Sequence, residues 1–222
     1  MKTAIDPLVV HRLVRLGLGL VLYGTSIALM LTAGLGVDSW DVLHQGLSLR
    51  TGVTFGWVVN GVSVAVLLLW VGLRLRPGFG TVANALVVGF AADAVLGVLA
   101  TPRNIMGRLA VLVIGIVANG IATGLYIGAG LGPGPRDGLM TGLSARTGWS
   151  IRSVRTGIEI TVLTAGWALG GPVGIGTVVY AVSIGALSQY FIARLSVQEA
   201  KPDRRRARTS RLAAVEGVES RA

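Results

Sequence analysis

The chain has 222 residues, of which 52% are hydrophobic and only 14% charged, and its mean hydropathy is +0.71. Average soluble domains carry about 25% charged residues, so this composition excludes an ordinary soluble domain. The continuous apolar runs exclude the alternating pattern of a membrane β-barrel, and the absence of cysteine excludes disulfides and thiolate metal sites. We therefore predict an all-α polytopic membrane bundle, whose formal net charge of +10 reports orientation rather than nucleic-acid binding.

About six transmembrane helices are predicted from runs near the 20 residues that cross a bilayer. The fifth is the weakest, because Arg152, Arg155 and Glu159 crowd its start. The first follows basic residues, as the apolar part of a signal peptide would, but it is too long for that part and is predicted to be retained. In chain order the predicted spans are 12–33, 54–73, 79–100, 109–129, 153–170 and 175–195.

Lysine and arginine are distributed unequally between the two sides of these spans. With six spans, 17 of the 20 basic residues lie on the same side as the N-terminus. The positive-inside rule then predicts that both termini lie in the cytoplasm. A five-span topology would place the basic tail outside, which counts against it.

The two halves of the chain repeat each other at a spacing of 96 residues. "GLGVDSWDVLHQGLSLRTG" begins at Gly34 and "GLGPGPRDGLMTGLSARTG" at Gly130, and about 30 of the 79 positions from 12 to 90 are identical without a gap. Because each half holds three spans, the second half must enter from the opposite side, which is the inverted-topology repeat of many secondary transporters. The predicted organisation is a first repeat (1–101), a second repeat (102–198) and a basic disordered cytoplasmic tail (199–222).

Each repeated phrase predicts one short helix between its glycines. In the first copy Ser39 can cap the helix, with Asp41 in the first turn and Arg50 in the last; in the second copy Pro135 fits the first helical position. About eleven residues are too few to span, so the helix is either re-entrant or interfacial. The preceding Gly-Leu-Gly sequences allow sharp turns, and the predicted hinges are Gly34, Gly36, Gly130 and Gly132.

The paired aspartates Asp41 and Asp137 admit two interpretations. They can cap the short helices against the macrodipole, or they can bind a proton or a cation near the middle of the membrane. Arg50 and Arg146 fit helix C-termini or lipid headgroups better than a substrate clamp.

Several polar residues inside the predicted spans occupy matched positions in the two halves. Asp93, in the third span, is the costliest, and it is either a functional acid or half of a structural pair. Its repeat partner is Gln189, while Asn119 matches Tyr23 and Asn84 matches Tyr180. These six residues are the candidate substrate or ion ligands: Asp93, Asp41, Asp137, Gln189, Asn119 and Asn84.

The remaining motifs indicate packing rather than chemistry. Gly120, Gly124 and Gly128 form small-xxx-small steps that allow close helix contact, either inside one chain or between subunits. Glu159 has Arg155 one turn earlier and is expected to pair with it locally. No nucleotide loop, zinc motif or catalytic triad is present, so we expect no enzymatic activity, no metal and no cofactor.

The doubled "GLGxxxxDxLxxGLSxRTG" phrase followed by "GxGT" resembles the YczE-type bacterial integral membrane proteins, which are distantly related to the YitT group. The similarity covers about residues 10–195. It implies a location in the bacterial cell (plasma) membrane and several spans, but no settled activity, no substrate and no catalytic residue.

Composition and repeat together favour a small secondary transporter or permease for a polar solute, coupled to a proton or cation. The alternatives are a non-transporting regulatory or scaffold protein and an oligomeric channel. The expected partners are membrane lipids, a small-molecule substrate and other copies of the chain in a homo-oligomer, but no nucleic acid.

Overall fold

The computed structural model describes residues 6–197 and is helical throughout that range, without strands. Five of its helices, α1, α3, α4, α5 and α8, are long and apolar enough to cross a membrane. The weak fifth span is α7, which is as long as α4 but carries Arg152, Arg155 and Glu159, so its crossing stays a prediction. The predicted tail lies outside the described residues. The helices are α1 (Pro7–Ala33), α2 (Ser39–Thr51), α3 (Phe55–Leu73), α4 (Phe79–Leu96), α5 (Ile105–Gly128), α6 (Pro135–Thr147), α7 (Ile151–Ala168) and α8 (Ile175–Leu195).

The helices of the two halves correspond one to one. The starts of α2, α3 and α4 at residues 39, 55 and 79 recur 96 positions later as the starts of α6, α7 and α8. The repeated sequence is therefore a repeated set of four helices.

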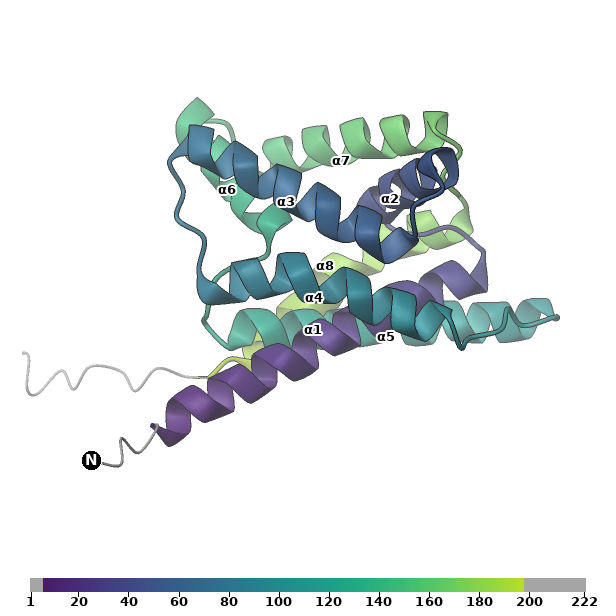
Figure 1. The fold of residues 1–222 in the computed structure, drawn as a ribbon, viewed down its shortest axis with the longest axis horizontal. Coiled ribbons are helices and arrows are strands. Elements are labelled where there is room, and N and C mark those ends of the chain that lie inside the picture. Colours follow the sequence, from purple (N-terminus) through teal and green to yellow (C-terminus); the bar gives the residue numbers. More distant parts are fainter. Residues whose placement is uncertain (1–5, 198–222) are drawn as a thin grey trace, which may run out of the picture.

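The eight helices pack as two groups of four (Figure 1). In the first group, α1 packs against α5, and each of them carries the last helix of its own half, α4 or α8. In the second group the halves exchange partners, because α2 packs on α7 and α6 packs on α3. Contact between α3 and α4 joins the two groups.

α1 and α5 run antiparallel. Arg108, near the start of α5, donates to the carbonyl oxygens of Ala33 (2.6 Å) and Gly34 (2.7 Å) at the end of α1. Midway along α1, Gly19 lies so close to the end of α5 that a Cβ there would stand 2.8 Å from the Tyr126 nitrogen. The first helices of the two halves therefore meet antiparallel.

Two glycine turns connect the groups and tie the halves together. Gly36 (φ +100°) and Gly132 (φ +121°) adopt backbone conformations that side chains rarely allow. Directly before them, the Leu35 carbonyl accepts from the Gly176 amide and the Leu131 carbonyl from the Gly80 amide, both at 2.8 Å. Each turn is thus bonded to the first turn of the last helix of the opposite half. All four predicted hinge glycines have positive φ: Gly34, Gly36, Gly130 and Gly132.

The short helices α2 and α6 follow the sequence prediction except at the N-cap of α2. The N-cap of α2 is Asp38 and not Ser39, because the Asp38 carboxylate accepts from the Asp41 amide at 2.7 Å. Pro135 does occupy the first turn of α6, and both helices end at left-handed glycines, Gly52 and Gly148. The first two turns of α2 are largely buried and its last turn is exposed, so its N-terminus lies inside the molecule.

The glycine stripe of α5 packs inside the chain. A Cβ on Gly124 would stand 2.8 Å from Phe191 of α8, and Gly120 and Gly128 face the same helix. The close contact that the sequence left open is therefore the contact between α5 and α8.

Gly36→Ala should destabilise the fold, because alanine rarely adopts φ +100° and its Cβ would meet the Gly174 nitrogen at 2.5 Å. We expect a loss of about 2–4 kcal/mol, seen as a lower thermal-unfolding midpoint in detergent. The matched control is Gly61→Ala in α3, where a Cβ meets nothing within 4 Å and helix propensity gives about 0.5–1 kcal/mol of stabilisation. Equal midpoints for the two variants would contradict the role of the glycine turn.

Candidate functional site

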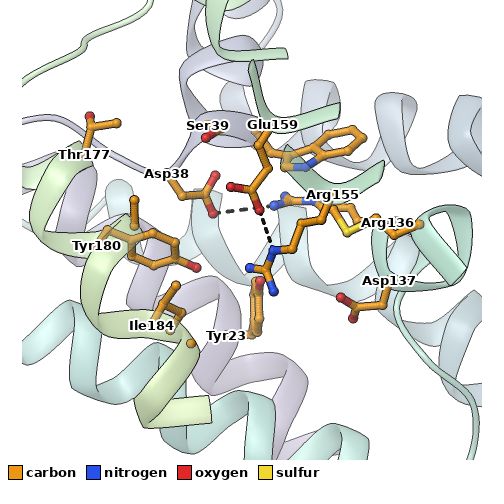
Figure 2. A pocket seen from close by; sticks show the side chains of 14 residues that line it. Tyr23, Asp38, Ser39, Arg136, Asp137, Arg155, Glu159, Thr177, Tyr180 and Ile184 are labelled. Carbon is orange, nitrogen blue, oxygen red and sulfur yellow. Dashed lines mark hydrogen bonds and ion pairs between the residues drawn. The ribbon is translucent and has the colours of Figure 1, made fainter. Parts of the chain in front are cut away.

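A polar cavity of about 190 Å³ lies between the two helix groups. It shares Tyr23, Asp137 and Tyr180 with an adjoining space of about 240 Å³ that extends along α5 and α8. In Figure 2 the labelled side chains converge from both halves of the chain, with Asp38 and Tyr180 facing Asp137 across the cavity. The lining residues are Tyr23, Asp38, Ser39, Trp40, Arg136, Asp137, Met140, Arg155, Glu159, Thr177, Tyr180, Ala181, Ile184 and Gly185.

The N-termini of α2 and α6 meet at one wall of this cavity. Arg136, the second residue of α6, places one guanidinium nitrogen 3.5 Å from Asp38 Oδ2 and the other 3.7 Å from Asp41 Oδ1. The same guanidinium lies over the Trp40 ring at 5.1 Å. Since Trp40 and Arg136 are 96 residues apart, equivalent positions of the two repeats contact each other where the halves meet.

A second ion pair lines the cavity from α7. Arg155 Nε lies 2.9 Å from Glu159 Oε1, which confirms the local pair expected from the sequence. Arg155 is 51% exposed and Glu159 31%, so this pair is more accessible to water than the pair of Arg136 with Asp38. The pair thus belongs to the cavity wall and is not merely a surface feature of the helix.

Of the three carboxylates that line the cavity, Asp137 is the one to which the described residues supply no basic partner. Its Oδ2 accepts from the Tyr126 hydroxyl at 2.7 Å, and within residues 6–197 no lysine, arginine or histidine lies at ion-pair distance from it. Nearby, the Tyr180 hydroxyl donates to Asn119 Oδ1 at 3.0 Å. The cavity therefore offers a carboxylate that is in no ion pair within residues 6–197, beside several phenol groups.

Burial shifts the acid–base behaviour of the charges on α2. Burial raises the pKa of Asp41 to about 6, although Arg136 opposes the change. Burial, and then the charge of Asp41, raise the pKa of Asp38 as well, while burial lowers the pKa of His44 to about 3. His44 Nδ1 lies 3.0 Å from Asp41 Oδ1, and a neutral imidazole is the form this site favours.

Of the six predicted ligands, the structure brings four to the cavity and its extensions. Asp137 lines all of them, Asn119 and Gln189 line the α5–α8 extension, and Asn84 lines a small neighbouring space of about 40 Å³. Asp41 stands directly behind the wall, where it contacts Arg136.

Asp93, a residue of α4, lies away from the cavity and beside the first turn of α3. α4 ends at Leu96 and not near residue 100, so Asp93 is within one turn of a helix end. Its Oδ1 accepts from the Gly56 amide at 2.7 Å, and its Oδ2 accepts from the Thr54 hydroxyl. Within residues 6–197 these hydrogen bonds to the first turn of α3 take the place of the structural pair that the sequence suggested, and a functional role for Asp93 stays a prediction.

Arg50 and Arg146 bind backbone carbonyls at the ends of neighbouring helices. Arg50 donates to the Leu169 carbonyl and Arg146 to that of Gly72, at equivalent places in the two halves. Neither lines the cavity, in agreement with the helix-end role that the sequence favoured.

Sequence reasoning missed the residues that connect the halves. Asp38, Arg136, Tyr23 and Tyr180 were not candidate ligands, although Tyr23 and Tyr180 appeared as polar partners of Asn119 and Asn84. One signal was present: Arg136 aligns with Trp40, a charged residue opposite an aromatic one beside the duplicated aspartates. Nothing in the sequence shows that these two side chains touch.

Comparison with known proteins agrees with the resemblance to YczE. The model of a family of unknown function, DUF6198, matches residues 10–193. An uncharacterized protein of Haemophilus influenzae is 42% identical over 79% of this chain and 82% of its own. The uncharacterized membrane protein YczE of Bacillus subtilis is 34% identical over 78% and 81%, and the uncharacterized protein YyaS of the same organism is 30% identical over 79% and 90%. No solved structure matches the chain.

Asp41→Asn should stabilise the protein at high pH. The native state holds a proton at Asp41 more tightly than the unfolded chain, so this residue favours folding below its ordinary pKa of 3.8 and loses that contribution as the pH rises through about 6. At pH 8 the variant should exceed the wild type by on the order of 1 kcal/mol, or roughly 2–4 °C in melting temperature. Below about pH 3.8 the gap should close, because Asp41 is then protonated in both the folded and the unfolded state; a gap that stays constant with pH would refute the shift.

Proposed function

Since this chain belongs to DUF6198, a family of unknown function, we propose from its own geometry that it is a small secondary transporter for a polar solute. The observation that carries the proposal is the charged cavity between the two helix groups, where the N-termini of α2 and α6 meet. The solute binds in this cavity, among Asp137, Arg155 and the tyrosines.

The free-energy cost of burying ionisable side chains supports a functional site between the helices. The protein belongs to a membrane family and has at least five apolar helices, yet it buries Asp38 and Asp41 and partly buries Arg136 between them. Burying a charge costs several kcal/mol after relaxation, and an ion pair between helices is rarely more stabilising than apolar packing. Ionisable groups inside a membrane bundle are therefore a mark of substrate or ion pathways.

The relation between the halves supports alternating access. If α1 and α5 both cross the membrane, their antiparallel packing inverts the two halves with respect to it. α7, which belongs to the same helix group as α3 in Figure 1, then crosses as the counterpart of α3. With six spans and the positive-inside rule, both termini face the cytoplasm. Movement of the second helix group against the first would open the cavity to one side at a time.

Transport can be tested by filling the cavity without disturbing the fold. Gly185 lines the cavity and its extension, and a Cβ there meets nothing within 4 Å. In proteoliposomes screened with polar solutes, with and without a proton gradient, the wild type should take up solute, and Gly185→Leu should reduce uptake at least ten-fold. The control is Gly61→Leu, also in a helix and without neighbours, which should transport as the wild type does.

The outcome that contradicts transport is equally definite. Uptake no higher than in protein-free liposomes across the whole panel would refute it and favour the regulatory or scaffold alternative. Equal inhibition by both leucine variants would show that the cavity is not the pathway.

Inverted topology can be tested with cysteines at equivalent exposed positions in this cysteine-free chain. Val53 and Trp149 are 96 residues apart, follow α2 and α6, and are 45% and 68% exposed. In intact cells a membrane-impermeant maleimide should label Val53→Cys, and it should label Trp149→Cys only after the cells are opened. Labelling of both from one side would exclude inversion.

A further inference from the structure

We infer that the cavity binds a monovalent organic cation. This deepens the proposed function by naming the substrate class of the same cavity, and it therefore rests on that function for its physiological meaning. Binding itself is measurable whether or not the protein transports.

The charge balance of the cavity is the first argument. Its wall and the layer directly behind it hold four carboxylates but only two guanidinium groups, and the buried His44 favours its neutral form. The helix N-termini of α2 and α6 offset this deficit by about one half charge each, so about one negative charge remains. In a low-dielectric interior a single bound cation would neutralise it. The carboxylates are Asp38, Asp41, Asp137 and Glu159, and the guanidinium groups are Arg136 and Arg155.

The arginines are already occupied, which argues against an anionic ligand. Arg136 is held between Asp38 and Asp41, and Arg155 is held by Glu159. An anion would have to displace a carboxylate from one of them. A cation needs no such exchange, because among the described residues the Tyr126 hydroxyl is the sole hydrogen-bond partner of Asp137, on one oxygen.

The cavity walls favour an organic cation over a metal ion. Within residues 6–197 no three histidine or acidic side chains converge closely enough to hold a metal ion. Instead, Tyr23 and Tyr180 place aromatic rings around the space that Asp137 faces (Figure 2), and Trp40 also lines the cavity. Aromatic rings beside a carboxylate are the usual setting for substituted ammonium groups. The space of about 190 Å³, continuous with another of about 240 Å³, has room for a small one.

The test uses the purified full-length chain in nanodiscs with tetramethylammonium chloride as the probe. Thermal unfolding and tryptophan fluorescence are followed against sodium chloride at equal ionic strength, with sodium acetate as the anionic probe. We expect saturable stabilisation by tetramethylammonium and none by acetate. Stabilisation by acetate alone, or by sodium as strongly as by tetramethylammonium, would overturn the inference.

Three variants are compared, so that the test still decides if one of them fails to fold. Asp137→Asn should weaken tetramethylammonium binding at least ten-fold. Arg155→Gln, at a half-exposed position, should strengthen it several-fold because it removes a competing positive charge. The control Asp93→Asn, at the helix cap outside the cavity, should bind as the wild type does. Unchanged binding in Arg155→Gln and Asp137→Asn would overturn the inference.

Failure of the cation-site inference can be distinguished from failure of the transporter proposal. Tetramethylammonium binding that follows these charge changes, in a protein that moves no solute, would support the cation site and refute the transporter. Uptake of an anion or neutral solute without cation binding would keep the transporter and overturn the cation site.

Discussion

The architecture depends on satisfying backbone groups where the chain breaks its helical pattern inside the bundle. Away from water, an unpaired amide or carbonyl costs several kcal/mol, so a non-helical turn persists only where protein groups bond to it. The turns at Gly36 and Gly132 meet this requirement reciprocally, because each presents a leucine carbonyl to the first amides of α8 or α4 from the other half. Neither half can complete its own turn alone.

These reciprocal hydrogen bonds set where the short helices α2 and α6 begin. Because each turn is bonded to the opposite half, the short helix after it starts in the interior, and its N-terminus faces the cavity. α2 then lies on α7 and α6 on α3, so the second helix group is built from exchanged partners. The close backbone contacts this needs explain small residues such as Gly46 and Gly166, which approach each other across α2 and α7.

Residue differences between the two copies of the repeat make the site asymmetric, although the helices of the two halves correspond. The frame keeps Asp41 and Asp137 in both copies, but Trp40 in one copy faces Arg136 in the other, and Asp38 corresponds to Gly134. One half therefore supplies the acid and the aromatic ring, and the other supplies the cation that contacts both. The contact of Arg136 with Asp38 and Trp40 therefore lies between the two halves, and movement of one half against the other would change it directly.

The sequence alone determined the helical membrane class, the 96-residue duplication, the positions of the glycine turns and the membership of the YczE-like family. The class and the turns follow from composition, from apolar run length and from backbone preferences that act within a few residues, whereas the duplication and the family resemblance follow from matching residues in the repeated phrase. It also predicted the pair of Arg155 with Glu159, since residues four apart on a helix meet whatever surrounds them. What only the tertiary structure decided is which polar groups meet across the halves. Asp93 and Asp137 look alike in sequence, yet one caps α3 and the other faces the cavity, and Arg136 meets Asp38 only because exchanged packing brings together residues 98 positions apart.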